Sequence, residues 1–295
     1  MKEFYNSILV PTDFSEQSLV ALEQTYNLAY LNKINVTLLH VIPETSGNSF
    51  IPFFSKVQSK LLTKQYSDEC LANLNKIIDK ASKKTKVIIK PLLETGKVYE
   101  KILEVSESIF AKYIVLGVNS QPFDTKKRAY LGSNTLRVLK EAKCPVMTIK
   151  GKVFRNGCNI IVLPLDLTKE TRKKVEKAIE LAKYFDASIK VLSALLTDDA
   201  AVVNHLTEQL QQVRNYIFER SIVCTAELRT GIKGKDTRVS IILNYAREVD
   251  ADLIMIMTQP ENDWVAFFVD SASQDIISQS TVPVMSLSPQ NMTDL

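Results

Sequence analysis

The sequence predicts two tandem α/β domains, each a doubly wound five-stranded parallel sheet with helices on both faces. Each half of the chain alternates short apolar runs with amphipathic stretches, which is typical of Rossmann-like sheets covered on both sides. Three segments of the first half also recur, in the same order, in the second: residues 8–13 as 161–166, 111–116 as 251–256, and 144–149 as 282–287. Three ordered matches favour duplication over chance similarity.

The domain boundaries follow from the repeat. The offset between the copies falls from 153 to 140 to 138, which indicates a deletion inside the second copy. Gly151, Asn156 and Gly157 interrupt the pattern between the copies. We therefore expect one domain at residues 1–151 and another at residues 157–295.

Copy one shows the expected elements most clearly. Continuous apolar runs predict strands near residues 6–12, 34–42, 86–92, 112–117 and 145–149. Helical patterns predict helices near residues 15–31, 55–83, 97–110 and 132–142. Ser15 is expected to cap the first helix, with Glu16 in its first turn. Apolar residues recur along that helix at Leu19, Leu22, Tyr26 and Ala29.

Composition narrows the class of protein. The chain has 295 residues, 45% hydrophobic and 24% charged, with a formal net charge of +4 and no long basic stripe, so no nucleic-acid partner is predicted. The N-terminus lacks the features of a signal peptide, and no apolar run approaches the ~20 residues that span a bilayer. The expected location is the cytoplasm, without membrane association.

Cysteine and histidine usage excludes further classes of site. No CxxC pair is present, and scattered cysteines fit reduced, buried thiols at Cys70, Cys144, Cys158 and Cys224. With only two histidines, no multi-histidine metal site is expected. His40 lies in an apolar run and reads as a satisfied core or rim residue, whereas His205 falls on a polar helix and is expected at the surface.

Ligands of such sheets bind beyond the carboxyl ends of the strands. In copy one, Pro11, Thr12 and Asp13 follow the first strand, and Val41 lies at the end of the second. Leu116-Gly117 ends the fourth strand, and a loop after it reaches Gly132-Ser133-Asn134 at the start of a helix.

Gly132-Ser133 has two interpretations. A glycine at a helix start lets a phosphate approach free N–H groups, and a serine hydroxyl adds a donor. Alternatively, the glycine serves a tight turn and the serine is an N-cap. Composition alone favours the second interpretation.

The motifs together resemble the universal stress protein family, over both copies. The resemblance rests on ILVPTDFS at the first strand, LLHVI at the second, the strand end at Gly117, and GSN followed by CPVMTI. It implies a five-stranded parallel sheet in each copy. In nucleotide-binding members, a Gly-x2-Gly-x9-Gly-Ser/Thr loop holds the ATP phosphates, and residues after the first two strands approach the adenosine.

Carried onto this chain, the resemblance implies an ATP site, with Mg²⁺, in copy one. The base and ribose positions are Pro11, Thr12, Asp13 and Val41. The phosphate positions are Gly117, Gly132 and Ser133, and the expected site also includes Leu116, Ser120 and Asn134. Two departures are present: Ser120 replaces the second glycine, and eleven residues rather than nine precede Gly132. The longer loop carries Lys126, Lys127 and Arg128, which read as a solvated charge run or as mobile phosphate contacts.

Copy two is expected to bind no nucleotide in this manner. It keeps the family spacing but has Met257, Pro260 and Asp270 at the three glycine positions, followed by Ser271. Proline offers no N–H group, and an aspartate at a helix start repels phosphate. Asp166 follows its first strand, but a single carboxylate predicts little. Its loop from Trp264 to Phe268 carries three aromatic residues, which favour internal packing over a partner surface.

The family commonly dimerises through its last strands. Two copies in one chain can make that contact internally, so we expect the strands near Val146–Ile149 and Val284–Leu287 to pair as an internal pseudo-dimer. A further homodimer is compatible with the sequence.

The leading hypothesis is a cytoplasmic, non-enzymatic stress-response protein with an adenine nucleotide as regulatory ligand of copy one. An alternative is a nucleotide-independent interaction module with an unidentified protein partner. A slow ATPase ranks last, because no positioned general base is visible.

Overall fold

The computed structural model describes residues 5–44, 56–118, 131–151, 157–166, 171–257 and 271–287, with side chains described from residue 64 onward in the second helix and from residue 172 in the fifth. These residues form two compact units, residues 1–117 and 118–295. None of the described helices is long and apolar enough to cross a bilayer.

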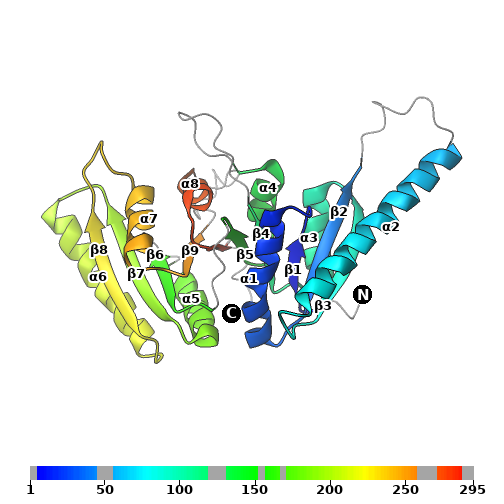
Figure 1. Cartoon of the computed structure of the whole chain (residues 1–295). Coiled ribbons are helices and arrows are strands. Elements are labelled where there is room, and N and C mark those ends of the chain that lie inside the picture. The colour runs from blue at the N-terminus through cyan, green and yellow to red at the C-terminus, as the bar shows by residue number, and fades with distance from the viewer. Residues whose placement is uncertain are drawn as a thin grey trace. The chain divides into compact units, whose positions relative to one another are not determined.

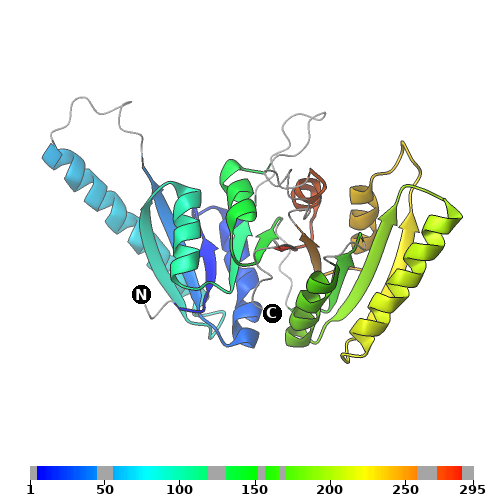
Figure 2. The same cartoon turned by 180° about the vertical axis from the view of Figure 1, so that it is seen from behind.

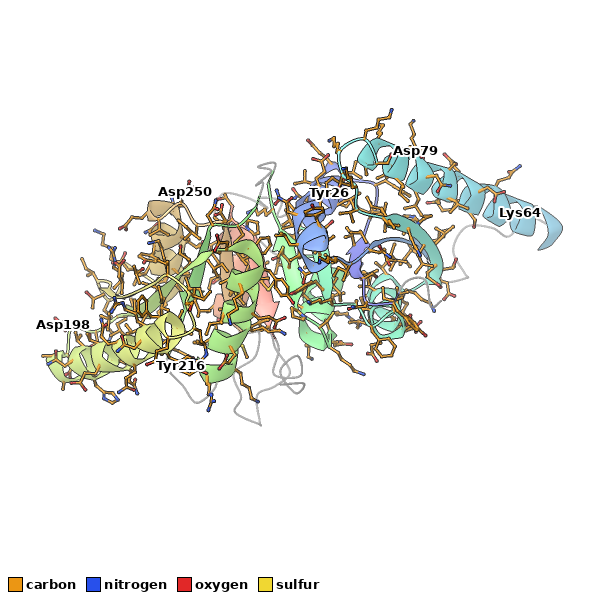
Figure 3. All side chains as sticks on the ribbon, turned by 90° about the horizontal axis from the view of Figure 1, so that it is seen from below. Tyr26, Lys64, Asp79, Asp198, Tyr216 and Asp250 are labelled. Atoms are coloured by element: carbon orange, nitrogen blue, oxygen red, sulfur yellow. The ribbon has the colours of Figure 1, made fainter. Side chains whose placement is uncertain are left out.

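The first unit is a parallel sheet with helices on both faces. Its elements are β1 (Ile8–Pro11), α1 (Glu16–Asn32), β2 (Val36–Pro43), α2 (Lys56–Ala81), β3 (Ile89–Gly96), α3 (Val98–Ser108) and β4 (Tyr113–Gly117). The strands pair in parallel in the order β3-β2-β1-β4. Helices α1 and α2 cover one face of this sheet and α3 covers the other (Figures 1 and 2). Figure 3 shows Lys64 and Asp79 along the length of α2.

The second unit contains the rest of both copies. Its elements are α4 (Ser133–Glu141), β5 (Val146–Ile149), β6 (Ile160–Pro164), α5 (Thr171–Phe185), β7 (Ser188–Leu195), α6 (Ala200–Phe218), β8 (Cys224–Thr230), α7 (Arg238–Glu248), β9 (Leu253–Met257), α8 (Ser271–Gln279) and β10 (Val284–Leu287). The strands pair in the order β5-β10-β9-β6-β7-β8, and every pair except β5–β10 is parallel. Helices α5 and α6 cover one face of the strands from β9 to β8, and α7 and α8 the other (Figures 1 and 2).

The pairing predicted for the last strands is confirmed. β5 and β10 run antiparallel, with Thr148 opposite Val284. The Thr148 hydroxyl also donates to the Val284 carbonyl, at 3.2 Å. Each sequence copy contributes five of the described strands. The two packing units divide them differently, with four strands in the first unit and six in the second. The packing units therefore divide at Gly117, because β5 pairs with β10, while the sequence repeat divides near Gly151.

Most predicted elements lie where the sequence places them. The exception is β3, which was expected at residues 86–92 and spans Ile89–Gly96. Its register explains the shift, because β3 pairs with β2 from Val36–Ile89 through Pro43–Gly96. Backbone hydrogen bonds to β2 extend β3 over the polar residues Glu94 and Thr95. A prediction from continuous apolar residues does not include these two positions.

The interior consists mainly of aliphatic side chains of the central strands. Ile8, Leu9 and Val10 of β1 are fully buried, as are Ile161, Val162 and Leu163 of β6. Three of the four cysteines, Cys70, Cys158 and Cys224, are buried. Burial raises the pKa of the Cys224 thiol to about 11, so this residue behaves as a small apolar side chain.

Candidate functional site

The turn after β1 is held by its own hydroxyl and carboxylate groups. The Thr12 and Ser18 hydroxyls lie 2.8 Å apart and are buried, and the Phe14 N–H donates to the Thr12 hydroxyl at 3.1 Å. Sequence reasoning did not identify Ser18, because a buried serine inside a helix has no distinctive pattern. This pair fixes the first turn of α1 against the end of β1.

Ser15 caps α1, as predicted. Its hydroxyl accepts from the Ser18 N–H at 3.3 Å. The Asp13 carboxylate accepts from both the Ser15 hydroxyl, at 2.5 Å, and the Ser15 N–H, at 3.0 Å. Partial burial raises the pKa of Asp13, but the hydrogen bonds from Ser15, Ser18 and its own backbone together outweigh this effect, and the net pKa is below the ordinary 3.8. Asp13 is therefore an exposed, ionised carboxylate at neutral pH.

The Ser15→Ala variant is expected to lose about 1 kcal/mol of stability with its cap. The pKa of Asp13 should rise at the same time, because the variant loses the Ser15 hydroxyl, which donates one of the hydrogen bonds that lower it. NMR titration of the Asp13 carboxyl measures this shift. Thr237→Ala removes the comparable cap of α7 and should destabilise without moving Asp13. An Asp13 pKa unchanged in Ser15→Ala would contradict the assignment.

His40 is buried beside this turn. Its Nδ1 lies 2.8 Å from the Thr12 carbonyl, and because a carbonyl only accepts, Nδ1 carries the proton. Its ring also lies against Phe14, with ring centres 4.2 Å apart. The side chain is 8% exposed, and Nε2 has no partner in the described structure. His40 is thus a core residue, as expected, but only one of its two ring nitrogens has a hydrogen-bond partner among the described residues. His205 is exposed, as predicted.

Gly117 ends β4 where the strand meets α1. A Cβ there would lie 2.4 Å from the Gln17 carbonyl oxygen and 2.8 Å from the Ser18 nitrogen. The backbone of Gly117 is not left-handed, so packing requires the glycine. The buried Val41, at the end of β2, and Leu116, beside Gly117, lie at the same carboxyl edge as Pro11–Asp13. The first unit thus brings together six of the predicted site residues.

Gly132, Ser133 and Asn134 belong to the second unit and are all exposed. Gly132 is the N-cap of α4, with φ −59° and, within the described chain, no capping side chain. Among the described residues, no heavy atom lies within 4 Å of a Cβ built there. Neither backbone strain nor packing against the described part of the chain requires this glycine. The interpretation of Ser133 as the N-cap is wrong, since Gly132 is the N-cap and Ser133 is the first helical residue.

Several predicted residues lie outside the described part of the chain. They are Ser120, the Lys126–Arg128 run, Pro260, Asp270 and the aromatic loop from Trp264 to Phe268. In copy two, Met257 ends β9 at the position of Gly117, and its carbonyl accepts from the Ser273 hydroxyl of α8 at 2.7 Å. Copy two therefore presents a side chain and an internal hydrogen bond where copy one has a bare glycine.

The sequence profile described as the Universal stress protein family matches residues 4–150 and 158–287. The universal stress protein MJ0577 of Methanocaldococcus jannaschii is 28% identical over 162 residues, which is 52% of this chain and 99% of that protein. A universal stress protein structure from Archaeoglobus fulgidus matches 96% of this chain and 98% of its own, with TM-score 0.74 and 20% identity. A putative member from Pseudomonas aeruginosa matches 99% and 96%, with TM-score 0.65 and 16% identity. With both halves matched in tandem, the chain belongs to the universal stress protein family.

Proposed function

We propose that copy one binds an adenine nucleotide, ATP with Mg²⁺, as a regulatory ligand of a cytoplasmic stress-response protein. The observation that carries this proposal is Gly132. It opens α4 without a capping side chain in the described chain, is exposed, and is required neither by its φ nor by its neighbours. A bare helix start with free N–H groups is suited to phosphate, and the exposed Ser133 hydroxyl adds a donor.

The first unit supplies groups suited to the nucleoside. Val41 is apolar and buried at the end of β2, where a base can lie against it. The ionised, exposed Asp13 carboxylate accepts hydrogen bonds, which suits ribose hydroxyls. The same lowered pKa makes Asp13 a weak general base, which favours a regulatory over a hydrolytic role. Binding then acts on partners by favouring one of two conformations with unequal nucleotide affinity.

The test begins with protein purified without added nucleotide. Denaturing it and measuring released small molecules by mass spectrometry should give about one adenine nucleotide per chain. About two would contradict the assignment of copy two as non-binding. None, together with no binding on titration with millimolar Mg-ATP, would overturn the proposal. The interaction-module hypothesis would then stand, and Trp264→Ala would test whether the aromatic loop captures a partner.

Variants at Gly132 test the site itself. Gly132→Asp should abolish ATP binding, because it places a carboxylate where phosphate binds and copies Asp270 of the second copy. Gly132→Ala should weaken binding without loss of stability, because the added methyl group meets no atom of the described residues within 4 Å. The matched control is Ser271→Asp, which adds the same charge at the start of α8 and should leave affinity unchanged. Unchanged affinity in Gly132→Asp would contradict the site.

A further inference from the structure

Strand β8 leaves one row of backbone groups open at the edge of the second unit (Figure 1). It is the outermost strand there, and among the described residues it pairs only with β7. The Ile189 N–H donates to the Val223 carbonyl at one end of this pairing, and the Gly231 N–H donates to the Leu195 carbonyl at the other. Peptide groups alternate in direction along a strand, so the odd-numbered residues of β8 face β7. The N–H and C=O groups of its even-numbered residues therefore point away from the sheet.

In the first unit, a proline blocks the corresponding edge. β3 is the outermost strand, and the Val36 N–H of β2 donates to the Ile88 carbonyl that precedes β3. The even-numbered residues of β3 thus face β2, and Pro91 lies in the outward-facing row. Proline has no N–H to offer there, and proline at an outward position is a usual protection of an edge strand.

The counterpart of this proline in copy two is Ala226. The first two strands of the copies are related by the offset of 153 and pair in the same register. This offset relates Leu38 of β2 to Val191 of β7, and these residues lie opposite Pro91 and Ala226 respectively. β8 contains neither proline nor lysine, so it lacks the residues that usually protect an exposed edge.

The charged side chains of β8 are complementary to a second copy of the same strand. Glu227 and Arg229 lie on one face of β8, on either side of Leu228, and their side chains are 39% and 40% exposed. Arg229 donates to Glu227 and to Glu248 of α7 within its own chain, which holds its charge on this face. When two β8 strands pair antiparallel about a two-fold axis at Leu228, each Glu227 lies directly opposite an Arg229 of the other strand. Opposite charges in directly opposed positions stabilise a sheet.

Two exposed apolar side chains flank the open strand. Val223, directly before β8, is 72% exposed, and Ile232, shortly after it, is 63% exposed. Val223 precedes Leu228 by five residues and Ile232 follows it by four, so the same two-fold axis brings Val223 of one chain next to Ile232 of the other. Pairing of two β8 strands therefore covers apolar surface at both ends as well as the open backbone row.

We propose that two copies of this chain associate through β8, by antiparallel pairing about a two-fold axis at Leu228. Leu228 then exchanges both of its outward backbone hydrogen bonds with Leu228 of the second copy, and Ala226 exchanges its two with Thr230. This contact continues the sheet from one chain into the next and is distinct from the β5–β10 pairing within one chain. It does not depend on the nucleotide proposed for copy one, because β8 belongs to copy two.

Ala226→Pro tests the open backbone row, because it transfers the proline of copy one to the equivalent position. In sedimentation equilibrium the wild-type chain should have twice the mass of one chain, and Ala226→Pro the mass of one. Position 226 faces away from β7, so the variant keeps the hydrogen bonds of the sheet and should show unchanged circular dichroism. Ala226→Ser, which keeps the N–H group, is the matched control and should remain a dimer. A wild-type chain with the mass of one chain would overturn the proposal, as would a folded Ala226→Pro protein that is still a dimer.

Charge reversal tests the register of the pairing. Arg229→Glu and Glu227→Arg each place two pairs of like charges across the axis, so each variant alone should associate at least about tenfold more weakly than the wild type. An equimolar mixture of the two variants should form dimers again, because every glutamate then lies opposite an arginine. Mixing cannot restore the ion pairs that Arg229 makes with Glu227 and Glu248 inside one chain, so recovery distinguishes pairing between chains from damage to the fold. A mixture that associates no better than either variant alone would overturn the pairing at Leu228.

Discussion

Replacing Gly117 by alanine is expected to lower the free energy of unfolding by about 3 kcal/mol. The new Cβ would lie 2.4 Å from the Gln17 carbonyl oxygen and 2.8 Å from the Ser18 nitrogen. Both atoms are backbone, so no side-chain rotation relieves the contact, and the first turn of α1 must move. That movement also disturbs the buried Thr12–Ser18 hydroxyl pair. Urea unfolding followed by circular dichroism measures the loss.

The matched control is the same substitution at Gly132. There the φ is −59° and no atom of the part of the chain that the structure describes lies within 4 Å of the added methyl group, so stability should change by no more than about 0.5 kcal/mol. Equal destabilisation by the two variants would show that contact with the Gln17 backbone does not determine the effect at Gly117. A stable Gly117→Ala protein would contradict the close packing of β4 against α1.

Lys174 of α5 is buried, and replacing it by methionine is expected to stabilise the protein at pH 7 by about 2 kcal/mol. The fall of the Lys174 pKa from 10.5 to about 8 corresponds to about 3 kcal/mol against the folded charged form. Loss of the hydrogen bond to the Pro164 carbonyl offsets about 1 kcal/mol. Methionine keeps an unbranched stem of similar length, so it fills the same space.

The difference in the free energy of unfolding between the wild type and Lys174→Met should depend on pH. Between about pH 8 and 10.5 the unfolded lysine still binds a proton that the folded one has lost, so wild-type stability rises relative to Lys174→Met. The raised pKa values of Tyr26 and Tyr245 act oppositely above pH 10, but equally in both proteins, so they cancel in the difference. Urea unfolding at pH 7 and pH 9.5 measures the change. Lys173→Met, at an exposed position, should show neither effect, and a pH-independent difference would contradict the burial of the ammonium.

The alternation of elements was predictable because a sheet covered on both faces requires continuous apolar strands between amphipathic helices. The Ser15 cap was predictable because its signal is local. The β5–β10 pairing was predictable because the family resemblance implies contact through the last strands and duplication places two such strands in one chain. The extent of β3 was not, since backbone pairing with β2 carries it through Glu94 and Thr95. The apolar pattern of a sequence reports only the burial of side chains. β3 is the outer strand of its sheet, so few of its side chains need to be buried.

The candidate site also has parts that the sequence predicted and parts that it could not. The strand-end positions Pro11–Asp13 and Gly117 were visible in the sequence, since parallel strands end at one edge. The sequence could not show why each glycine is needed. Gly117 is needed because a Cβ would clash with the Gln17 backbone carbonyl, a hundred residues away in the chain, whereas no described residue requires a glycine at position 132. Glycine looks alike in a sequence whether a neighbour, a dihedral angle or a ligand requires it.

By itself, the sequence determined the duplication, the two α/β domains, the parallel direction of the strands within each copy and the loss of glycines in copy two. These are properties of local pattern and of order along the chain. Only the tertiary structure decided that β5 belongs to the second packing unit, that His40 is buried with no partner for Nε2 among the described residues, and that Lys174 reaches the end of β6. Each of these depends on contacts between distant segments, because burial and hydrogen bonding are set by which elements pack together.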